Sequence, residues 1–592
     1  MFGRAQSICR VRRRPPLWAP KHPSNPVQAL APSCEDARRN PMPAHFPNES
    51  ESRQARYGRA VIGFALVGPV VYIACLVYVM LARRTYPFDL EWMEGGMLTH
   101  AARLIEGRPI YAKPSLDFIA YFYTPLYSVL VAALARATAL SYALGRSVSI
   151  VATLGTLLLL FDFGRRQAGT LYGILAASLY AALFRTTGAF YDLVRPDPLA
   201  LFLTLAGASV AYYRCSALSA AAAALLFVAA YFTKQTAAIA GISVGLWLFA
   251  RCRRRGSVFL GTAFGVGVTI AVILDQRTDG WFRFYVLLGH QTHSFLWKHA
   301  VLEYWRDLLC LMPLLCLVPL LRESYGQHRR WIACALVLLF SLALAQRIST
   351  LDYDYHQYYR ELWYEKPRWA LLLPPVLVAL LLGFVRVRTT PTGHVPGFFL
   401  VFFGAGVLAS LLNHSTQWAY SNCFMPFVLG ASLYVPLAIA GFIESSNAAL
   451  RGHAGAILLA LLVQCVALGY DPKAQIPDQY DREAFANLDG VLSGLRGQVL
   501  MPAHPFFMYE RGGPLALHQV GIGDVYWAGG VPDLESRMRR HEFAYVIIDS
   551  RARLPVVERY YRPYRGIAYP TEGALLPRTG FLTRPLMIYQ AK

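Results

Sequence analysis

The feature that most constrains this chain is a long series of apolar runs separated by short charged segments. A helix that crosses the hydrocarbon core of a bilayer needs about 20 mostly apolar residues. Fourteen runs are candidates, and several are short enough to require tilted or broken helices. They lie near 60–82, 121–139, 141–163, 168–186, 198–213, 217–232, 235–251, 257–275, 305–321, 330–346, 369–386, 397–413, 423–443 and 455–469. This pattern predicts an all-α polytopic membrane protein.

Composition and charge agree with this class. Charged residues make up 16% of the chain and the mean hydropathy is +0.36, whereas a soluble domain carries about 25% charged residues. The net charge is +22, and many basic residues stand in short clusters between apolar runs, which is typical of cytoplasmic loops. The clusters are Arg165–Arg166, Arg251–Arg255, Arg329–Arg330, and Arg386 with Arg388. Because no continuous basic stripe with interleaved aromatic residues is present, the sequence indicates no nucleic-acid partner.

The basic cluster at 251–255 serves as the anchor for predicting sidedness, because it is the densest in the membrane portion. Placed in the cytoplasm, it puts the later loops alternately outside and inside, and the region after 470 outside. Three apolar runs lie between 120 and 195, where the charge pattern requires an even number of crossings. One run is therefore a half-crossing, a re-entrant segment or part of a bent helix. The consistent solution has about 13 transmembrane helices, a cytoplasmic N-terminus and an external C-terminus, in a bacterial inner (plasma) membrane.

The two ends of the chain differ from the membrane portion at 59–469. Residues 1–58 are rich in Pro and Arg and have no periodic apolar pattern, which predicts a disordered basic cytoplasmic tail. Residues 470–592 alternate between helical and strand patterns, which predicts a small external soluble α/β domain. Its expected elements are helices at 481–495 and 533–540 and strands at 498–501 and 543–548, the last closed by Asp549.

The first external loop, 83–120, contains the most informative cluster of acidic residues. Asp89, Glu91 and Glu94 follow the first span directly. Carboxylates gathered at a membrane surface can bind a divalent cation or act as a general base toward a hydroxyl. The alternative is a solvated loop with ordinary surface acids.

Two further segments fall on the same predicted face. Arg195 can bind a phosphate through its guanidinium fork, and Asp197 can join the first-loop carboxylates, although Asp197 followed by Pro198 also suits a helix start. Lys234 stands between two apolar stretches, where a lysine is either functional or extends to the membrane surface.

Other external segments carry weaker patterns. His290 and His293 are spaced to bind a metal or a phosphate, but such pairs are more often structural. The loop at 347–368 is rich in Tyr and acids, which suits carbohydrate binding and, more commonly, an aromatic belt at the membrane surface. Asn422 closes another external loop whose role the pattern leaves open.

Together these segments resemble the GT-C-fold glycosyltransferases, which use polyprenyl-phosphate-linked sugars. This group includes the protein mannosyltransferases and the aminoarabinose transferases of lipid A. The similar motifs occur in order over about 60–300. They are Asp89-Leu90-Glu91 with Glu94-Gly95, Gly107-Arg108-Pro109-Ile110-Tyr111, Tyr123-Thr124-Pro125-Leu126-Tyr127, Arg195-Pro196-Asp197 and Lys234. Thr124 stands where the family usually has proline.

The resemblance implies a GT-C-like membrane domain and a donor that is a polyprenyl-phosphate-linked sugar, with a glycan, lipid or protein acceptor. The enzyme has to activate an acceptor hydroxyl and stabilise the departing lipid phosphate. The hypothesis makes Asp89 the general base, and Glu91 assists it or binds a metal. A divalent metal cation, if used, would bind Asp89 and Asp197. Donor phosphate binding is assigned to Arg195, Lys234 and His290, and Glu94, Tyr123 and Asn422 are further candidates.

Two other functions fit a polytopic chain. A secondary transporter would show paired repeats and charges deep inside several spans, whereas the candidate charges here gather at one face. A scaffold or receptor would use the external domain to bind a partner, and Asp89 and Arg195 would then be free to vary without effect.

Overall fold

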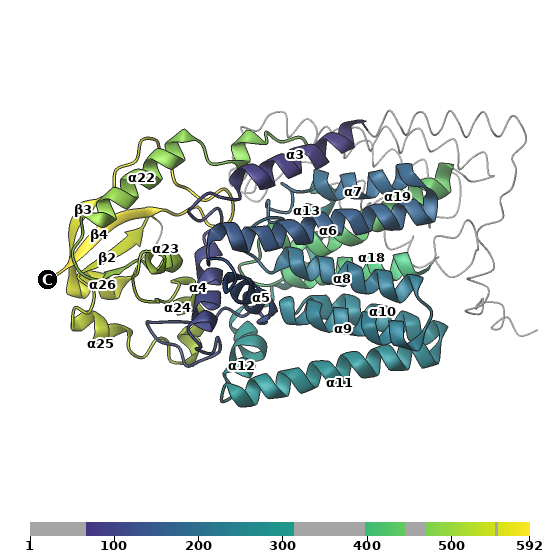
Figure 1. The fold of residues 1–592 in the computed structure, drawn as a ribbon, viewed down its shortest axis with the longest axis horizontal. Helices are drawn as coiled ribbons and strands as arrows, with labels where there is room; N and C mark the ends of the chain where they lie inside the picture. Colours follow the sequence, from purple (N-terminus) through teal and green to yellow (C-terminus); the bar gives the residue numbers. More distant parts are fainter. Residues whose placement is uncertain (1–66, 313–396, 444–463, 465–467, 551–553) are drawn as a thin grey trace, which may run out of the picture. The chain divides into compact units, whose positions relative to one another are not determined.

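The computed structural model describes residues 67–312, 397–443, 464, 468–550 and 554–592 (Figure 1). The predicted tail at 1–58, the Tyr-rich loop at 347–368, and the apolar runs at 330–346 and 369–386 lie outside the described residues. The count of 13 crossings is therefore not settled by the described part of the chain.

The described part of the membrane portion is mostly helical, as the apolar runs predict. Among the described residues, four helices are long and apolar enough to cross a membrane: Tyr142–Ala168, Arg253–Arg277, Gly397–His414 and Ser421–Gly441. The helices of this portion are α3 (Val67–Arg83), α4 (Glu94–Ile105), α5 (Leu126–Ala135), α6 (Tyr142–Ala168), α7 (Thr170–Ala182), α8 (Asp197–Tyr213), α9 (Ala217–Thr233), α10 (Ala237–Arg251), α11 (Arg253–Arg277), α12 (Trp281–Arg283), α13 (Tyr304–Leu311), α18 (Gly397–His414) and α19 (Met425–Ile443).

Small residues allow neighbouring helices of this bundle to approach closely. Gly164 of α6 faces Gly173 of α7, and a Cβ added to Gly173 would lie 2.5 Å from the Phe161 carbonyl oxygen. In the same way, a Cβ on Gly406 of α18 would lie 2.5 Å from the Pro426 carbonyl oxygen on α19. Such contacts are typical of helix packing in membranes, where dispersion rather than water exclusion drives association.

The structure also bears on the surplus apolar run between 120 and 195. Helix α5 has 10 residues, so it rises about 15 Å, which is half of a hydrocarbon core about 30 Å thick. Figure 1 shows α5 beside α4 rather than in line with the long helices. Of the helices in these three runs, α5 is the shortest and so the best candidate for the run that does not cross.

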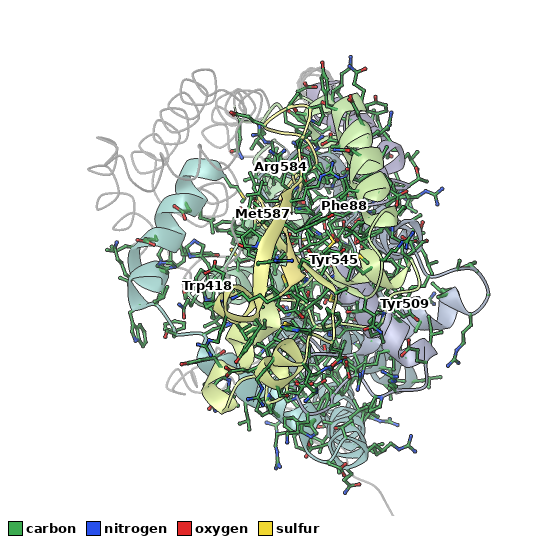
Figure 2. The ribbon with its side chains drawn as sticks, turned by 90° about the vertical axis from the view of Figure 1, so that its left-hand side faces the viewer. Phe88, Trp418, Tyr509, Tyr545, Arg584 and Met587 are labelled. Atoms are coloured by element: carbon green, nitrogen blue, oxygen red, sulfur yellow. The ribbon has the colours of Figure 1, made fainter. Side chains whose placement is uncertain are left out.

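The C-terminal region forms the predicted α/β domain, with a four-stranded sheet in the order β1-β2-β4-β3. Strand β1 pairs parallel with β2, and β4 pairs antiparallel with both β2 and β3. Figure 2 faces this sheet, with Tyr545 on β2 and Met587 on β4. The strands are β1 (Val499–Leu500), β2 (Tyr545–Asp549), β3 (Tyr561–Gly566) and β4 (Pro585–Ala591), and the helices are α22 (Gln479–Ser493), α23 (Pro505–Tyr509), α24 (Val520–Val525), α25 (Leu534–Arg539) and α26 (Pro555–Tyr560).

All four elements expected from the sequence of this domain are present, as α22, β1, α25 and β2. The sequence pattern does not reveal β3 and β4. Strand β3 contains Pro563 and is exposed along most of its length, with the burial pattern of a sheet edge rather than an alternating strand. The buried side chains of Val546, Ile547 and Ile588 form the centre of the sheet.

The first loop packs against this C-terminal domain. The Leu517 amide donates to the Leu116 carbonyl at 2.9 Å, and the Arg578 amide donates to the Leu90 carbonyl at 2.8 Å. Glu91 forms an isolated parallel bridge with Thr579. Residues that are hundreds of positions apart therefore build one region around Asp89 and Glu91.

Candidate functional site

Glu94 fixes the shape of the first loop through a buried ion pair with Arg146 of α6. Neither side chain is exposed. Glu94 Oε1 accepts from Arg146 Nε at 3.0 Å and from the Val194 amide at 2.8 Å, while Oε2 accepts from Arg146 Nη2 at 2.6 Å and from the Leu90 amide at 2.7 Å. Arg146 also donates to the carbonyls of Tyr86 and Phe88, both at 2.6 Å. Each Glu94 oxygen therefore accepts two hydrogen bonds. Glu94, which the sequence predicts as a further candidate, has a structural role in this protein.

A second buried ion pair ties the end of α3 to the segment before α8. Arg83 and Asp192 are both unexposed, and Arg83 Nε donates to Asp192 Oδ2 at 2.7 Å. Arg83 Nη2 also donates to Asp192 Oδ1 and to the Ala189 carbonyl. This pair holds the Arg195–Asp197 motif next to the first loop.

Asp89 lies inside the protein and contacts the C-terminal domain. Its Oδ1 accepts from the Gly95 amide at 2.7 Å, and its Oδ2 lies 2.6 Å from His504 Nδ1. His504 Nε2 lies 3.1 Å from Asp549 Oδ2, which also accepts from Thr583 Oγ1 at 3.0 Å. The side chains of Asp89 and His504 are unexposed. The predicted base therefore already has a hydrogen bond on each oxygen.

The electrostatics of this contact favour a charged His504. Burial acts to lower the pKa of His504, but the carboxylates of Asp549 and Asp89 outweigh it and raise the pKa to about 10. Burial raises the pKa of Asp89 above its usual range, with His504 acting in the opposite direction. These shifts favour an imidazolium placed between the carboxyl groups of Asp89 and Asp549.

Glu91 has the opposite character, because part of its hydrogen-bonding capacity is unused. Its side chain is 2% exposed, and Oε2 lies 3.5 Å from Arg195 Nη1 without forming a hydrogen bond. Arg195 Nη2 donates to the Tyr123 hydroxyl at 2.6 Å. Glu91 Oε2, Arg195 Nε and the Tyr121 hydroxyl are buried and have no hydrogen-bond partner among the described residues.

Burial raises the pKa of Glu91 to about 7, although the Arg195 guanidinium acts to lower it. A carboxyl group that titrates near neutral pH suits proton transfer. The close approach of the C-terminal domain helps to bury it: Gly580 has φ of 79°, and a Cβ there would lie 2.9 Å from Glu91 Oε1. Only glycine combines that backbone conformation with that proximity.

Asp197, Lys234 and Asn422 form the third part of the site. Asp197 Oδ1 accepts from Lys234 Nζ at 2.5 Å and from Asn422 Nδ2 at 3.0 Å. Asp197 Oδ2 is buried without a partner among the described residues. Asp197 begins α8 and Pro198 follows it in the first turn, so the predicted helix start is present. The N-cap position, however, belongs to Pro196, and the Asp197 side chain bonds to Lys234 and Asn422 instead of serving as the cap.

A small, partly open apolar cavity is lined in part by Asp197 and Lys234. It lies between α8, α10, α18 and α19, and mostly small or apolar side chains line it. These include Ala200, Ala237, Ala240, Ala405, Ala409 and Leu429. The Lys234 side chain is 16% exposed. The Lys234–Asp197 ion pair therefore lies at the boundary of an apolar cavity.

His290 and His293 are less closely connected to these groups. His290 lies beside Gln235 and the Phe122 ring, and burial lowers its pKa. His293 Nε2 lies 3.2 Å from Asp524 Oδ1 of the C-terminal domain. No hydrogen bond joins His290 to Arg195 or Lys234 in the described residues, so its predicted phosphate-binding role stays a prediction.

The described residues do not fit a divalent cation at Asp89 and Asp197. Each carboxylate already has a basic partner: His504 for Asp89, Arg195 for Glu91 and Lys234 for Asp197. Within the described ranges, no group of three or more His, Cys, Asp or Glu side chains could hold a metal ion.

The sequence patterns missed several residues of this site. Arg146 could have been recognised, because it is a charged residue near the start of an apolar run. A charge in such a position usually indicates an ion-pair partner. Asp549 could be noticed as an acid that closes a buried strand. His504 gave no signal, because its partners lie 415 and 45 positions away.

No protein-family model and no curated protein sequence matches the chain. Among solved structures, the chain is similar to ArnT from Cupriavidus metallidurans in the apo state, with 13% identity and a TM-score of 0.43 over 90% of this chain and 98% of that chain. It is similar to the same protein bound to undecaprenyl phosphate, with 12% identity and a TM-score of 0.42 over 88% and 97%. It is also similar to the apo oligosaccharyltransferase of Archaeoglobus fulgidus, with 13% identity and a TM-score of 0.40 over 89% and 76%. Because these likenesses are too weak to carry a function, the chemistry rests on the residues of this chain.

Proposed function

We propose that this protein is a membrane glycosyltransferase that transfers a sugar from a polyprenyl-phosphate donor to an acceptor hydroxyl. The reaction takes place on the external face of the membrane, where the first loop meets the C-terminal domain. The observation that carries the proposal is the Lys234–Asp197 pair, which stands at the boundary of an apolar cavity close to the incompletely bonded Arg195. A site for a lipid phosphate needs fixed cations for the phosphate and an adjoining apolar surface for the lipid chain.

Arg195 and Lys234 would bind the donor phosphate. Arg195 has a buried Nε without a partner among the described residues, and Lys234 has donors beyond the one it gives to Asp197. Both cations are held in place before the substrate arrives, Arg195 by Tyr123 and Lys234 by Asp197. Preorganised positive charge stabilises the phosphate that gains charge as it leaves. The small-residue cavity would take the start of the prenyl chain.

Proton transfer falls to the first loop. The sequence-based hypothesis gives this role to Asp89, and that prediction stays untested. The geometry favours Glu91, since its Oε2 is unbonded among the described residues, whereas both Asp89 oxygens already accept hydrogen bonds. In the step that we propose, the acceptor oxygen attacks the anomeric carbon and its proton moves to Glu91. The bond from that carbon to the phosphate oxygen breaks, and its electron pair leaves with the lipid phosphate. A single displacement inverts the anomeric centre.

The test compares Lys234→Met with the wild type in detergent, using synthetic polyprenyl-phosphate sugars. Removing this cation is expected to lower the rate of transfer by about 100-fold and to weaken binding of undecaprenyl phosphate. The matched control is Lys298→Met, because Lys298 is paired with Glu303 but its side chain is 76% exposed. The control should keep the wild-type rate.

Two results would overturn the proposal. One is equal transfer by wild type and Lys234→Met with both proteins folded. The other is wild-type protein that binds the lipid phosphate but transfers no sugar from any donor, which would favour a transporter of a lipid-linked solute.

A further inference from the structure

We propose that His504 is a positioning residue for transfer, because it bridges Asp89 and Asp549 and so holds the first loop, with Glu91, against the C-terminal domain. This inference rests on the proposed function. It makes the C-terminal domain a working part of the catalytic site, in addition to covering it.

The bridge uses both nitrogens of one imidazole ring. Nδ1 lies 2.6 Å from Asp89 Oδ2 and Nε2 lies 3.1 Å from Asp549 Oδ2, with all three side chains unexposed. A neutral histidine has one N–H, so it can donate to only one of two carboxylates. An imidazolium donates to both, and its positive charge offsets one of the two buried carboxylate charges.

Packing restricts the ring as well. The Phe88 ring lies 4.6 Å from that of His504, and Phe507 packs edge-on against Phe88 at 5.1 Å. His504 immediately precedes α23, whose first residue is Pro505, so its backbone lies at a fixed helix start. Asp549 ends β2, one of the two inner strands of the sheet, whose neighbours are β1 and β4. The bridge therefore extends from the centre of the sheet to the loop.

Three consecutive residues of the loop are bonded to the C-terminal domain. Asp89 contacts His504, the Leu90 carbonyl accepts from the Arg578 amide at 2.8 Å, and Glu91 bridges to Thr579. Thr583, four positions after Thr579, donates to Asp549. The segment that bonds to Glu91 is therefore also bonded to the far end of the His504 bridge. Only the His504 link in this set is made by charged side chains, and it anchors the residue two positions before Glu91.

Small displacements of a reacting group have large kinetic effects. A misplacement of about 1 Å can reduce a rate on the order of 100-fold. Residues 88–93 lie outside any helix or strand except for the single bridge at Glu91, so little regular hydrogen bonding replaces a lost contact. Loss of the Asp89 link is therefore expected to move Glu91 from its position beside Arg195 and to reduce kcat rather than binding.

A pair of substitutions separates the two halves of the bridge. In asparagine the amide nitrogen stands where histidine has Nδ1, and in glutamine it stands where histidine has Nε2. His504→Asn therefore keeps a donor for Asp89, and His504→Gln keeps one for Asp549. Both variants are neutral, so their loss of charge is matched. Transfer kinetics and thermal unfolding of both full-length variants would be measured in the same detergent.

We expect His504→Gln to lower kcat by about 10- to 100-fold with KM changed by less than about threefold. His504→Asn should retain at least about ten times the kcat of the glutamine variant. If His504→Gln fails to fold, Asp549→Asn serves in its place, because it keeps the shape and weakens only the far end of the bridge; about tenfold loss of kcat is expected. The control is His518→Gln, a buried histidine of the same domain that contacts the loop through the Trp92 carbonyl at 3.0 Å.

Each outcome decides the inference. Equal kcat for the asparagine and glutamine variants, or loss of activity that only follows the unfolding temperature as in the His518 control, would overturn it. A wild-type kcat in folded His504→Gln would also overturn it and would leave the proposed function intact. An inactive wild-type protein would instead overturn the proposed function, and this inference with it.

Discussion

The ion pairs around the first loop differ in how completely their atoms are hydrogen-bonded. At Arg146–Glu94, both carboxylate oxygens accept two donors each, and at Arg83–Asp192 both oxygens are also used. At Arg195–Glu91 and Lys234–Asp197, one carboxylate oxygen of each pair has no partner among the described residues. Apart from Lys234, which is partly exposed, the side chains of all four pairs are buried.

Among these four pairs, the completeness of hydrogen bonding distinguishes the structural ions from the candidate functional ions, whereas charge does not. When a ligand approaches a fully hydrogen-bonded buried pair, any new hydrogen bond replaces an existing one. The ligand therefore gains no net hydrogen bond from such a pair. A buried donor or acceptor without a partner is costly in a folded protein, and a ligand that bonds to it recovers that cost. The comparison therefore assigns Glu94 to the frame and Glu91 to the chemistry, although three positions separate them.

The first prediction concerns the frame. Arg146→Met would leave Glu94 buried with an uncompensated charge, and removing one partner of a buried pair costs about 3–5 kcal/mol. Most or all folded protein should be lost, as seen by size-exclusion chromatography and thermal unfolding in detergent. The double variant Arg146→Met with Glu94→Leu should recover part of this loss. A single variant as stable as the wild type would break the distinction between frame and site.

The sequence predicts that the candidate residues lie on one face of the membrane. In the structure, Arg195 lies beside Glu91, and Lys234 and Asn422 both contact Asp197. Their sidedness stays a prediction, and it rests on apolar runs and basic clusters, which are local properties of the sequence. The helical membrane portion and two of the four strands follow from the same local periodicity.

The sequence could not show which of these acids are structural and which are catalytic, because that depends on their hydrogen-bond partners in the folded protein. Glu94 becomes structural only through Arg146, 52 positions away, and Asp89 is engaged only through His504, 415 positions away. No local pattern encodes such pairings. The edge strand β3 was missed for a related reason, since its identity comes from pairing with β4 and not from alternation.

The second prediction concerns the site. Glu91→Gln should lower transfer by about 100- to 10,000-fold, since general base catalysis typically contributes that much, without lowering the unfolding temperature. In the wild type, the rate should rise with pH through about 7, because Glu91 must be deprotonated to accept the proton. A matched loss in Asp89→Asn with an unchanged rate in Glu91→Gln would return the base assignment to Asp89.

The third prediction tests Glu91 through stability. Its pKa is raised from about 4.5 in a free carboxyl to about 7 in the folded protein, so the folded state binds more protons between these values. Stability should therefore fall as the pH rises from about 4.5 to 7 and then level off. Glu91→Gln removes this loss, so the variant should match the wild type near pH 4.5 and exceed it at pH 8 by on the order of 2–3 kcal/mol. Unfolding temperatures of both proteins across this range provide the measurement, and a constant difference would contradict the prediction.

The smallest effect is expected from chelation. Each carboxylate that could take a cation already contacts His504, Arg195 or Lys234, and a divalent ion would have to displace or repel that charge. EDTA should therefore change the transfer rate by less than about twofold, and added Mn²⁺ or Mg²⁺ should not restore the Lys234→Met variant. A large loss on chelation that a divalent ion reverses would show that the basic partners move aside for a metal. The incompletely bonded oxygens of Glu91 and Asp197 would then be ligands, and the same comparison that marks them as functional would describe a metal centre instead of an ion-paired one.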